Sequence, residues 1–322
     1  MHRQAHVAPF LRAASDANIG WSLGELEQLS SQVVPPGILG MTPELLQGDI
    51  NKQWAQWFLR GICNIQYAHQ DGWKYPQINA HVREWVDKEF GGQSSHSEEL
   101  INLISRAIFN ELQRLRKRRE RQSVSFEIKQ ELIDICNGRA HCWICGYKFR
   151  NESISNFLDS TRYKIPLPKW IDIYKPIGIT ERDVKIEVDH ISPVCEGGDN
   201  SIENIRIACG WCNSHKGAHG SLYDVSGSAL ACELDGKAIS LPQPFWVVRM
   251  LSVIQRTFPG SRHCATTSEK ELTVTPQTSC GQMTPANLLI VSYDDERLNP
   301  DQLQPREKAE KLWAAAKRIA LS

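Results

Sequence analysis

Residues 187–217 gather most of the side chains in this chain that could do chemistry. The stretch reads EVDHISPVCEGGDNSIENIRIACGWCNSHKG and holds the adjacent pair Asp189 and His190, then Asn204 before a β-branched run, then a Cys-x2-Cys pair. An imidazole has a pKa near neutrality and can accept a proton at physiological pH. A carboxylate is a hard oxygen ligand for a divalent ion. These residue types point to acid–base and metal chemistry.

Four cysteines have the spacing of a metal site. Cys142 and Cys145 form one Cys-x2-Cys pair, and Cys209 and Cys212 form another. Two such pairs supply the four thiolates of a closed tetrahedral zinc site, so we expect structural Zn²⁺ here. The span between the pairs is longer than in a compact zinc ribbon, which predicts a structural unit whose two ends zinc holds together. The other six cysteines show no ligand spacing and are expected to be free thiols.

The local pattern indicates which elements position these residues. KIEVDHISP alternates apolar and polar residues as a strand does, which places Val188 and His190 on one face and Asp189 on the other. The loop VCEGGDNS is rich in turn residues, IRIA is a second short strand, and GWCNSHKG can open a helix. The expected order is strand, loop, strand, helix, with the second cysteine pair where the second strand ends.

These residues, in this order, resemble the HNH nuclease superfamily. VDHISP, then GG, then EN, then C-x2-C-N-x2-K-G follow one another over about residues 140–220, under a third of the chain. The resemblance implies the ββα-metal fold in its zinc-stapled variant. It also marks residues 150–183 as an insertion, because the gap between the cysteine pairs is usually shorter in this superfamily.

The resemblance implies a metal-dependent hydrolysis of phosphodiester bonds. His190 would be the general base that activates water, and Asp189 the first ligand of a catalytic Mg²⁺ or Mn²⁺. Asn204 corresponds to the asparagine that pins the loop through backbone hydrogen bonds and so orients the histidine.

The second ligand of the catalytic ion has two candidates. The position after the second cysteine pair is Asn213, which would bind through its amide oxygen, and His215 is the rival. Side chains two residues apart on a helix point roughly 200° apart around its axis, so only one of the two candidates can face Asp189. An amide oxygen suits Mg²⁺, whereas an imidazole favours softer ions. Lys216 either contacts a phosphate or caps the helix, and the sequence leaves both readings open.

The rest of the chain is assigned by pattern. We expect a weakly structured segment at 1–40, a helical region at 41–122, the nuclease domain at 123–222 and a C-terminal region of unknown role at 223–322. The fold class is α+β, with a mainly helical N-terminal region, the central ββα-metal domain and a mixed C-terminal region. Thr42 and Pro43 are typical of a helix start.

A basic run ends one predicted helix. Residues 114–121, RLRKRRER, follow a stretch with apolar residues at helical spacing. Its six basic residues either contact phosphates or form a solvated helix end, and they are Arg114, Arg116, Lys117, Arg118, Arg119 and Arg121. The whole chain gives no electrostatic argument for a nucleic-acid partner, since 37 basic residues balance 37 acidic ones.

Five aromatic residues of the helical region could be imagined as a surface on which bases stack. They are Trp54, Trp57, Phe58, Trp73 and Trp85. Helical spacing and aromatic bulk favour ordinary core packing for all five.

Composition and motifs together suggest a function class. With 41% hydrophobic and 23% charged residues the chain is typical of globular proteins, and neither a signal peptide nor a membrane span is expected, so we assign it to the cytoplasm. The leading hypothesis is an HNH endonuclease acting on DNA, in a restriction or antiviral defence system. RNA remains open as the substrate, as does a protein partner bound through the N- or C-terminal region. The alternative is a zinc-stabilised nucleic-acid-binding module without catalysis.

Overall fold

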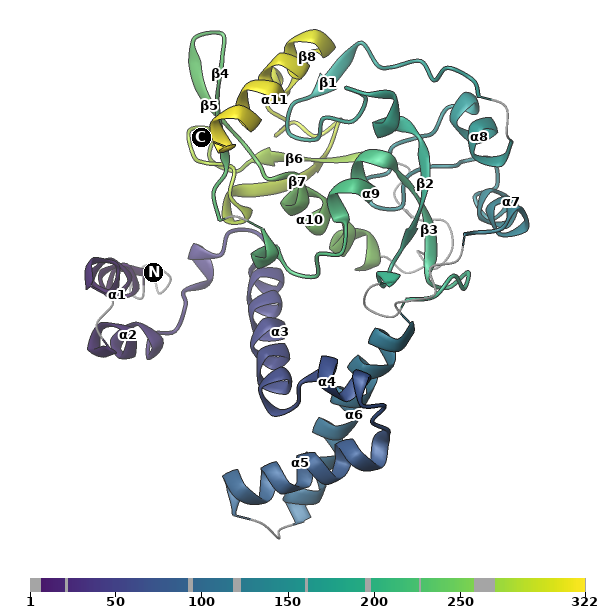
Figure 1. Ribbon diagram of the computed structural model, residues 1–322. Helices are drawn as coiled ribbons and strands as arrows, with labels where there is room; N and C mark the ends of the chain where they lie inside the picture. The colour runs from purple at the N-terminus through teal and green to yellow at the C-terminus, as the bar shows by residue number, and fades with distance from the viewer. Residues whose placement is uncertain are drawn as a thin grey trace.

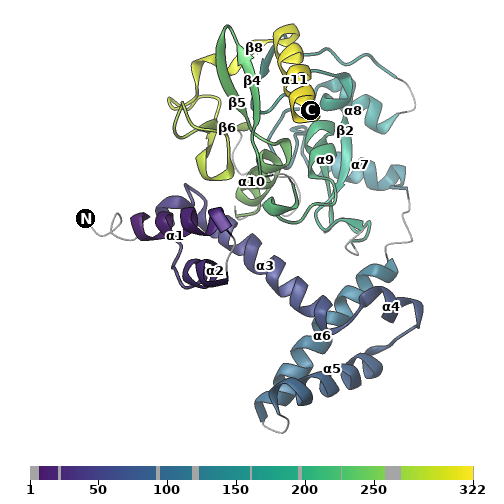
Figure 2. The same ribbon diagram turned by 60° about the vertical axis from the view of Figure 1, so that its left-hand side comes forward.

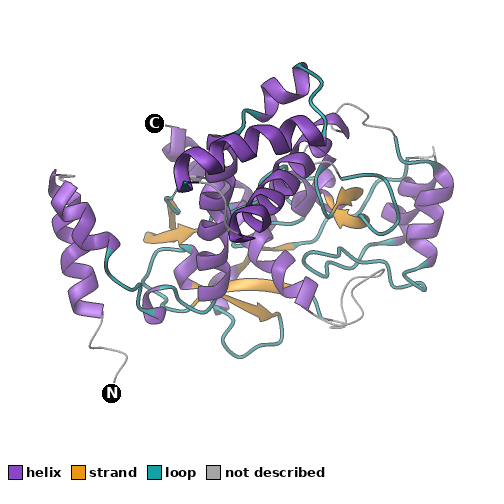
Figure 3. Cartoon of the chain, turned by 90° about the horizontal axis from the view of Figure 1, so that it is seen from below, coloured by secondary structure: helices purple, strands orange, loops and turns teal. Residues whose placement is uncertain are grey.

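The chain folds into helices and short antiparallel strand pairs in a computed structural model (Figure 1). The structure describes residues 7–20, 23–91, 95–117, 123–159, 162–194, 198–225, 227–257 and 270–321. Figure 3 shows the strands as short orange segments among a majority of purple helices. Within these ranges the strands form four sheets of two strands each, which confirms the α+β class.

The N-terminal segment contains two helices, α1 (Val7–Gly20) and α2 (Leu23–Ser30), followed by a 3₁₀ turn (Pro36–Ile38). The two helices contact each other. Neither contributes a described residue to a hydrophobic core. The segment expected to be weakly structured is therefore helical here, but it packs little against the rest of the chain.

Helices α3 to α6 form an arm with a core of its own. They are α3 (Pro43–Ile62), α4 (Ile65–Gln70), α5 (Tyr75–Phe90) and α6 (Ser95–Lys117). Pro43 occupies the first turn of α3, as expected. Helix α6 buries Ile101, Ile104, Ile108 and Leu112 along one stripe against α5, the helical spacing that the sequence shows.

Helix α3 connects the arm to the central part of the protein (Figure 2). Leu46, near its start, belongs to the central core, whereas Ile62 at its end belongs to the arm core. The middle of the helix lies between the two cores, and Trp54 (57% exposed), Trp57 (61%) and Phe58 (47%) are left uncovered. The prediction of core packing is wrong for these three residues. Trp73 and Trp85 do pack, partly buried, against the arm core.

The central part of the protein begins with α7 (Phe126–Asp134) and the first cysteine pair. The predicted insertion carries α8 (Asn151–Leu158) and β1 (Trp170–Asp172), and a 3₁₀ turn (Glu181–Val184) leads into β2 (Ile186–His190). Strand β3 (Ile205–Cys209) and helix α9 (Gly210–Lys216) complete the unit. The expected order of strand, loop, strand and helix is present.

The C-terminal region packs around this unit. Its elements are β4 (Leu230–Leu234), β5 (Lys237–Leu241), α10 (Pro244–Thr257), β6 (Leu272–Pro276), β7 (Leu288–Ser292), β8 (Leu303–Pro305) and α11 (Arg306–Leu321), with 3₁₀ turns at Leu222–Asp224, Pro285–Asn287 and Pro300–Gln302. One hydrophobic core contains residues from α7 through α11. None of the described helices has both the length and the apolar character needed to cross a lipid bilayer.

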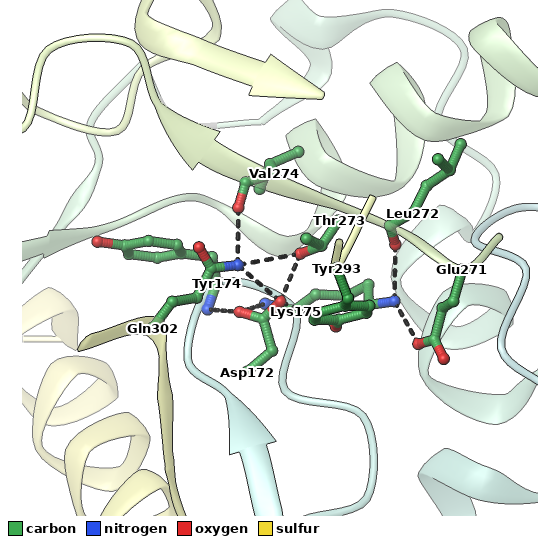
Figure 4. Close-up of polar contacts among 9 residues, drawn as sticks. All are labelled: Asp172, Tyr174, Lys175, Glu271, Leu272, Thr273, Val274, Tyr293 and Gln302. Carbon is green, nitrogen blue, oxygen red and sulfur yellow. Dashed lines mark hydrogen bonds and ion pairs between the residues drawn. The ribbon is translucent and has the colours of Figure 1, made fainter. Parts of the chain in front are cut away.

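A buried polar cluster fastens the insertion to the C-terminal region (Figure 4). Strand β1 pairs antiparallel with β8, and the Asp172 carboxylate accepts hydrogen bonds from the Tyr293 hydroxyl (2.9 Å) and from Gln302 Nε2 (2.8 Å). Lys175 Nζ donates to Glu271 Oε1 (2.6 Å) and to the carbonyl of residue 272 (2.7 Å). Buried charges need such partners, so the insertion and the C-terminal region depend on each other for their structure.

Candidate functional site

The two cysteine pairs come together as the spacing predicted. The four sulfur atoms of Cys142, Cys145, Cys209 and Cys212 all lie within 4.8 Å of one another, and all four residues are fully buried. Zn–S bonds of about 2.3 Å in a tetrahedron put the sulfur atoms about 3.8 Å apart, which this cluster can reach with small movements. The donor set therefore fits a structural zinc ion.

The backbone around the first pair explains why glycine follows it. The N–H of Gly146 donates to the Cys142 carbonyl (2.8 Å), and Gly146 has a φ of +76°. A Cβ on Gly146 would lie 2.9 Å from the carbonyl oxygen of Lys270, at the approach to β6. The N–H of Trp143 donates to the Ile207 carbonyl (3.1 Å), which attaches this turn to β3.

Burial affects the thiols themselves. Desolvation, together with the neighbouring sulfur atoms, raises the pKa of Cys209 and of Cys212 well above the ordinary value. Zinc binds thiolates, so occupation of the cluster would release protons and couple metal binding to folding.

Strands β2 and β3 and helix α9 position the candidate catalytic residues. In the antiparallel register, Asp189 lies opposite Arg206 and His190 opposite Ile205. Because side chains alternate along a strand, Glu187 and Asp189 share one face of β2. Helix α9 covers this face, since Asn213 and Lys216, one turn apart, bond to Glu187 and Asp189.

Asp189 is buried, at 4% exposure, and both carboxylate oxygens have partners. Trp143 Nε1 donates to Oδ2 (2.9 Å), and Lys216 Nζ donates to Oδ1 (2.8 Å). The Lys216 ammonium also donates to the His190 carbonyl. One cation therefore contacts both members of the Asp-His pair.

The position of Lys216 differs from both roles that the sequence left open. Lys216 is 7% exposed, so its ammonium does not face the solvent where a phosphate would approach. It is bound to Asp189 rather than to the last carbonyls of α9. The physical reason is charge: a buried carboxylate needs a partner, and this lysine is the nearest cation on the covering helix.

His190 is held through one ring nitrogen. Its Nε2 lies 2.7 Å from Asn200 Oδ1, and an amide oxygen only accepts hydrogen bonds. A neutral His190 in this position therefore carries its proton on Nε2 and has its lone pair on Nδ1. Nδ1 is the nitrogen that can take a proton from water.

Asn204 ties together the two sides of the loop between β2 and β3. Its Oδ1 accepts from the Ser192 N–H (2.9 Å), and its Nδ2 donates to the carbonyls of Ser192 (3.2 Å) and Asp199 (2.8 Å). A Cβ on Gly198 would lie 1.8 Å from the Ser192 oxygen, so only glycine fits beside Asn204. These contacts match the loop-pinning geometry that the resemblance implies; residues 195–197 of the loop lie outside the described ranges.

The two candidates for the second ligand face different neighbours. Asn213 Nδ2 donates to Glu187 Oε2 (2.6 Å), which leaves the amide oxygen without a partner among the described residues. The His215 ring packs on Trp211, with 5.0 Å between ring centroids. Burial, and then the charges of Lys317 and Arg182, lower the pKa of His215 to about 4. Asn213 is thus hydrogen-bonded to β2, and His215 is a neutral, half-buried side chain near α11.

Three further residues take part in this site without having been recognised in the sequence. Glu187 orients the Asn213 amide, Trp143 supports Asp189, and Asn200 holds His190. The alternation that placed Asp189 on one face of β2 also places Glu187 there, so that residue could have been found. Trp143 and Asn200 reach the site only through the folded loops.

The basic run is described only in part. Arg114 is exposed, and Arg116 donates to the Trp73 carbonyl, which ties it to the arm. Lys117 is the last residue of α6. Arg118, Arg119 and Arg121 lie outside the described residues, and a phosphate-binding role for the run stays a prediction.

Comparison with known proteins agrees with this geometry. The family model for HNH endonuclease matches residues 178–219, which contain β2, β3 and α9. No curated protein and no solved structure matches the chain. Residues 178–219 thus match the HNH endonuclease family, and the four gathered cysteines are consistent with the zinc-stapled variant of that domain.

Proposed function

We propose that this protein is a metal-dependent endonuclease that hydrolyses phosphodiester bonds in DNA. The observation that carries the proposal is the arrangement around β2. Among the described residues, His190 Nδ1 and the Asn213 amide oxygen have no hydrogen-bond partner, and Asp189 lies behind His190 on the opposite face of β2. A module that only binds nucleic acid has no need of a histidine oriented in this way.

His190 is the general base of the proposed reaction. Asn200 keeps the proton on Nε2, so Nδ1 accepts the proton of the attacking water. Asn204 holds the loop on which Asn200 stands, because it bonds the backbone at residues 192 and 199. The orientation of the base therefore depends on the backbone that Asn204 anchors at residues 192 and 199.

Asp189 and Asn213 are the residues that would hold a divalent ion. Carboxylate and amide oxygens are the hard donors that Mg²⁺ and Mn²⁺ prefer. When bound, such an ion supplies charge stabilisation at the phosphate and at the leaving oxygen. A carboxylate has about four lone-pair positions, so Asp189 can keep Trp143 as a partner while it binds a cation.

Lys216 acts as the counter-ion of Asp189 in this proposal. Its ammonium neutralises the buried carboxylate, and it would compete with a divalent ion for the Asp189 oxygen that it contacts. The lysine therefore keeps the site folded without metal and lowers its affinity for metal.

The proposal also includes the type of nucleic acid, the biological role, the location of the protein and a partner. DNA is favoured over RNA only because HNH relatives act on DNA more often, and a restriction or antiviral defence role rests on the same range of relatives. We place the protein in the cytoplasm, and we propose that the N-terminal helices or the C-terminal region bind a protein partner.

The test is incubation of the purified, zinc-loaded protein with supercoiled plasmid and with single-stranded DNA and RNA. Mg²⁺ or Mn²⁺ should support cutting of DNA, and EDTA should abolish it. Absence of cleavage with every metal and substrate would favour the alternative, a zinc-stabilised binding module.

A further inference from the structure

The exposed middle of α3 borders a polar pocket. The pocket has a volume of about 320 Å³, and Lys52, Trp57 and Arg60 line one of its walls together with two glutamines of the same helix. The other wall consists of Ala218, Gly220, Ser221 and Asp224. The Trp57 side chain is 61% exposed, so its ring is accessible at this pocket.

One wall of the pocket directly follows helix α9 of the candidate site in the chain. That wall begins at Ala218, two residues after Lys216, whose ammonium contacts Asp189. Two peptide units span at most about 7.6 Å between Cα atoms, so this wall continues directly from the end of α9. Figure 1 shows α3 and α6 extending from the same side of the central part of the protein.

Contacts between α3 and the central domain hold the two walls in place. Asp49 on α3 pairs with Arg249 (2.7 Å) and accepts from the Leu222 N–H (2.8 Å). Gln53 Nε2 donates to Asp224 Oδ1 (2.9 Å). The pocket is therefore a fixed feature of the junction between α3 and the central domain.

The charges of the pocket favour an anion. Lys52 is exposed and forms no ion pair with any described residue, and Arg60 lies 3.7 Å from Glu111 at the surface. Asp224, the one acid among the described lining residues, already accepts from Gln53 and from the N–H groups of residues 220 and 221. Lys52 and Arg60 thus flank the exposed ring of Trp57, and the Asp224 carboxylate already accepts hydrogen bonds from neighbouring residues.

We propose that this pocket binds a single strand of the DNA substrate, with one base stacked on Trp57 and phosphates near Lys52 and Arg60. Aromatic platforms flanked by basic side chains are how proteins bind unpaired strands without sequence preference. A protein partner with its contact centre here would desolvate the Lys52 ammonium, and lysine is depleted at such centres. The inference rests on the proposed nuclease function, for which the pocket would hold the strand beside the cleaved bond.

The experiment measures binding separately from cleavage. A labelled oligothymidylate of 20 nucleotides is mixed with the zinc-loaded protein, and its fluorescence anisotropy reports binding. Mg²⁺ and Mn²⁺ are left out so that no cleavage occurs. Trp57→Ala should weaken binding about five- to a hundredfold, which is the effect of losing one stacked base. Trp57→Phe should retain most of the affinity. Lys52→Gln should reduce the slope of log affinity against log salt by about 0.7.

Trp170 supplies the matched control. It is as exposed as Trp57, at 61%, but lies on β1 outside the pocket lining. Trp170→Ala should bind like the wild type. Three results would each overturn the proposal: wild-type affinity in Trp57→Ala, equal losses in both alanine variants, or no oligonucleotide binding by the wild type. The exposed tryptophans would then be assigned to a protein partner. Trp57-dependent binding without cleavage by any metal would instead contradict the nuclease function and leave this binding site intact.

Discussion

Replacing Lys216 by methionine probes the buried ion pair at the centre of the nuclease site. The substitution keeps most of the volume of the side chain but removes the charge that Asp189 faces at 2.8 Å. Both side chains are almost fully buried. Removing one partner of such a pair leaves an unpaired buried charge, which costs about 3–5 kcal/mol of unfolding free energy.

Zinc release is the assay for this variant, because a chain with several packed regions does not unfold in one two-state step. The protein is titrated with urea while a chromophoric indicator reports zinc set free from the cysteine cluster. Lys216→Met should release zinc at a markedly lower urea concentration than the wild type. Adding Asp189→Asn should recover most of the loss, because no unpaired charge then remains.

Divalent ions give the same variant a second readout. An ion at one hundred times its dissociation constant stabilises a folded protein by about 2.7 kcal/mol. Without Lys216 as a competitor, Mg²⁺ or Mn²⁺ should bind Lys216→Met more tightly and shift its zinc-release midpoint more than that of the wild type.

A surface pair is the control. Lys270 and Asp294 lie 2.5 Å apart but are largely exposed, so Lys270→Met should leave the midpoint unchanged. Release of zinc by Lys216→Met at the wild-type urea concentration would contradict a stabilising role of the buried Lys216–Asp189 pair. Equal stabilisation of Lys216→Met and the wild type by divalent ions would contradict the competition between Lys216 and the ion.

Three further predictions concern the same domain. Elemental analysis should find about one zinc per chain, and Cys145→Ser should lose it and unfold the domain; zinc-free but folded wild-type protein would contradict this. Asn213→Ala should lose Mg²⁺-dependent cutting and Glu187→Gln should weaken it, whereas His215→Ala should keep most activity; the reverse pattern would make His215 the ligand. The folded-state pKa of His215 is lowered from 6.5 to about 4, so only the unfolded chain takes up this proton between those values. Stability should therefore fall by on the order of 3 kcal/mol as the pH drops through this window, and His215→Gln should lose that part of the pH dependence in zinc-release titrations; an identical pH profile would contradict the burial of the ring.

The parts of the site that depend on local spacing could be predicted from the sequence. The cysteine pairs, the strand with Asp189 and His190 and the helix after Cys212 each depend on residues within a few positions of one another. The loop contacts of Asn204 follow the same rule, because its partners lie 5 and 12 residues away.

Contacts between distant segments could not be predicted in this way. Trp143 reaches Asp189 across 46 positions, and no periodicity indicates such a pairing. The exposure of Trp57 also depends on how distant segments of the chain pack. A helix with apolar residues at regular spacing is normally buried along one face, but α3 joins two separate cores, and Trp54 and Trp57 between them stay exposed.

The most direct test of the central claim is the single-turnover rate of plasmid cleavage by His190→Ala with Mg²⁺ and excess enzyme. We expect the rate to fall by about 10² to 10⁴, the usual contribution of a general base, with zinc content and DNA affinity unchanged. His219→Ala, a histidine of the same domain that packs on Phe245, should cut at close to the wild-type rate. Cleavage by His190→Ala at the wild-type rate would contradict the assignment of the catalytic site to β2 and its loop.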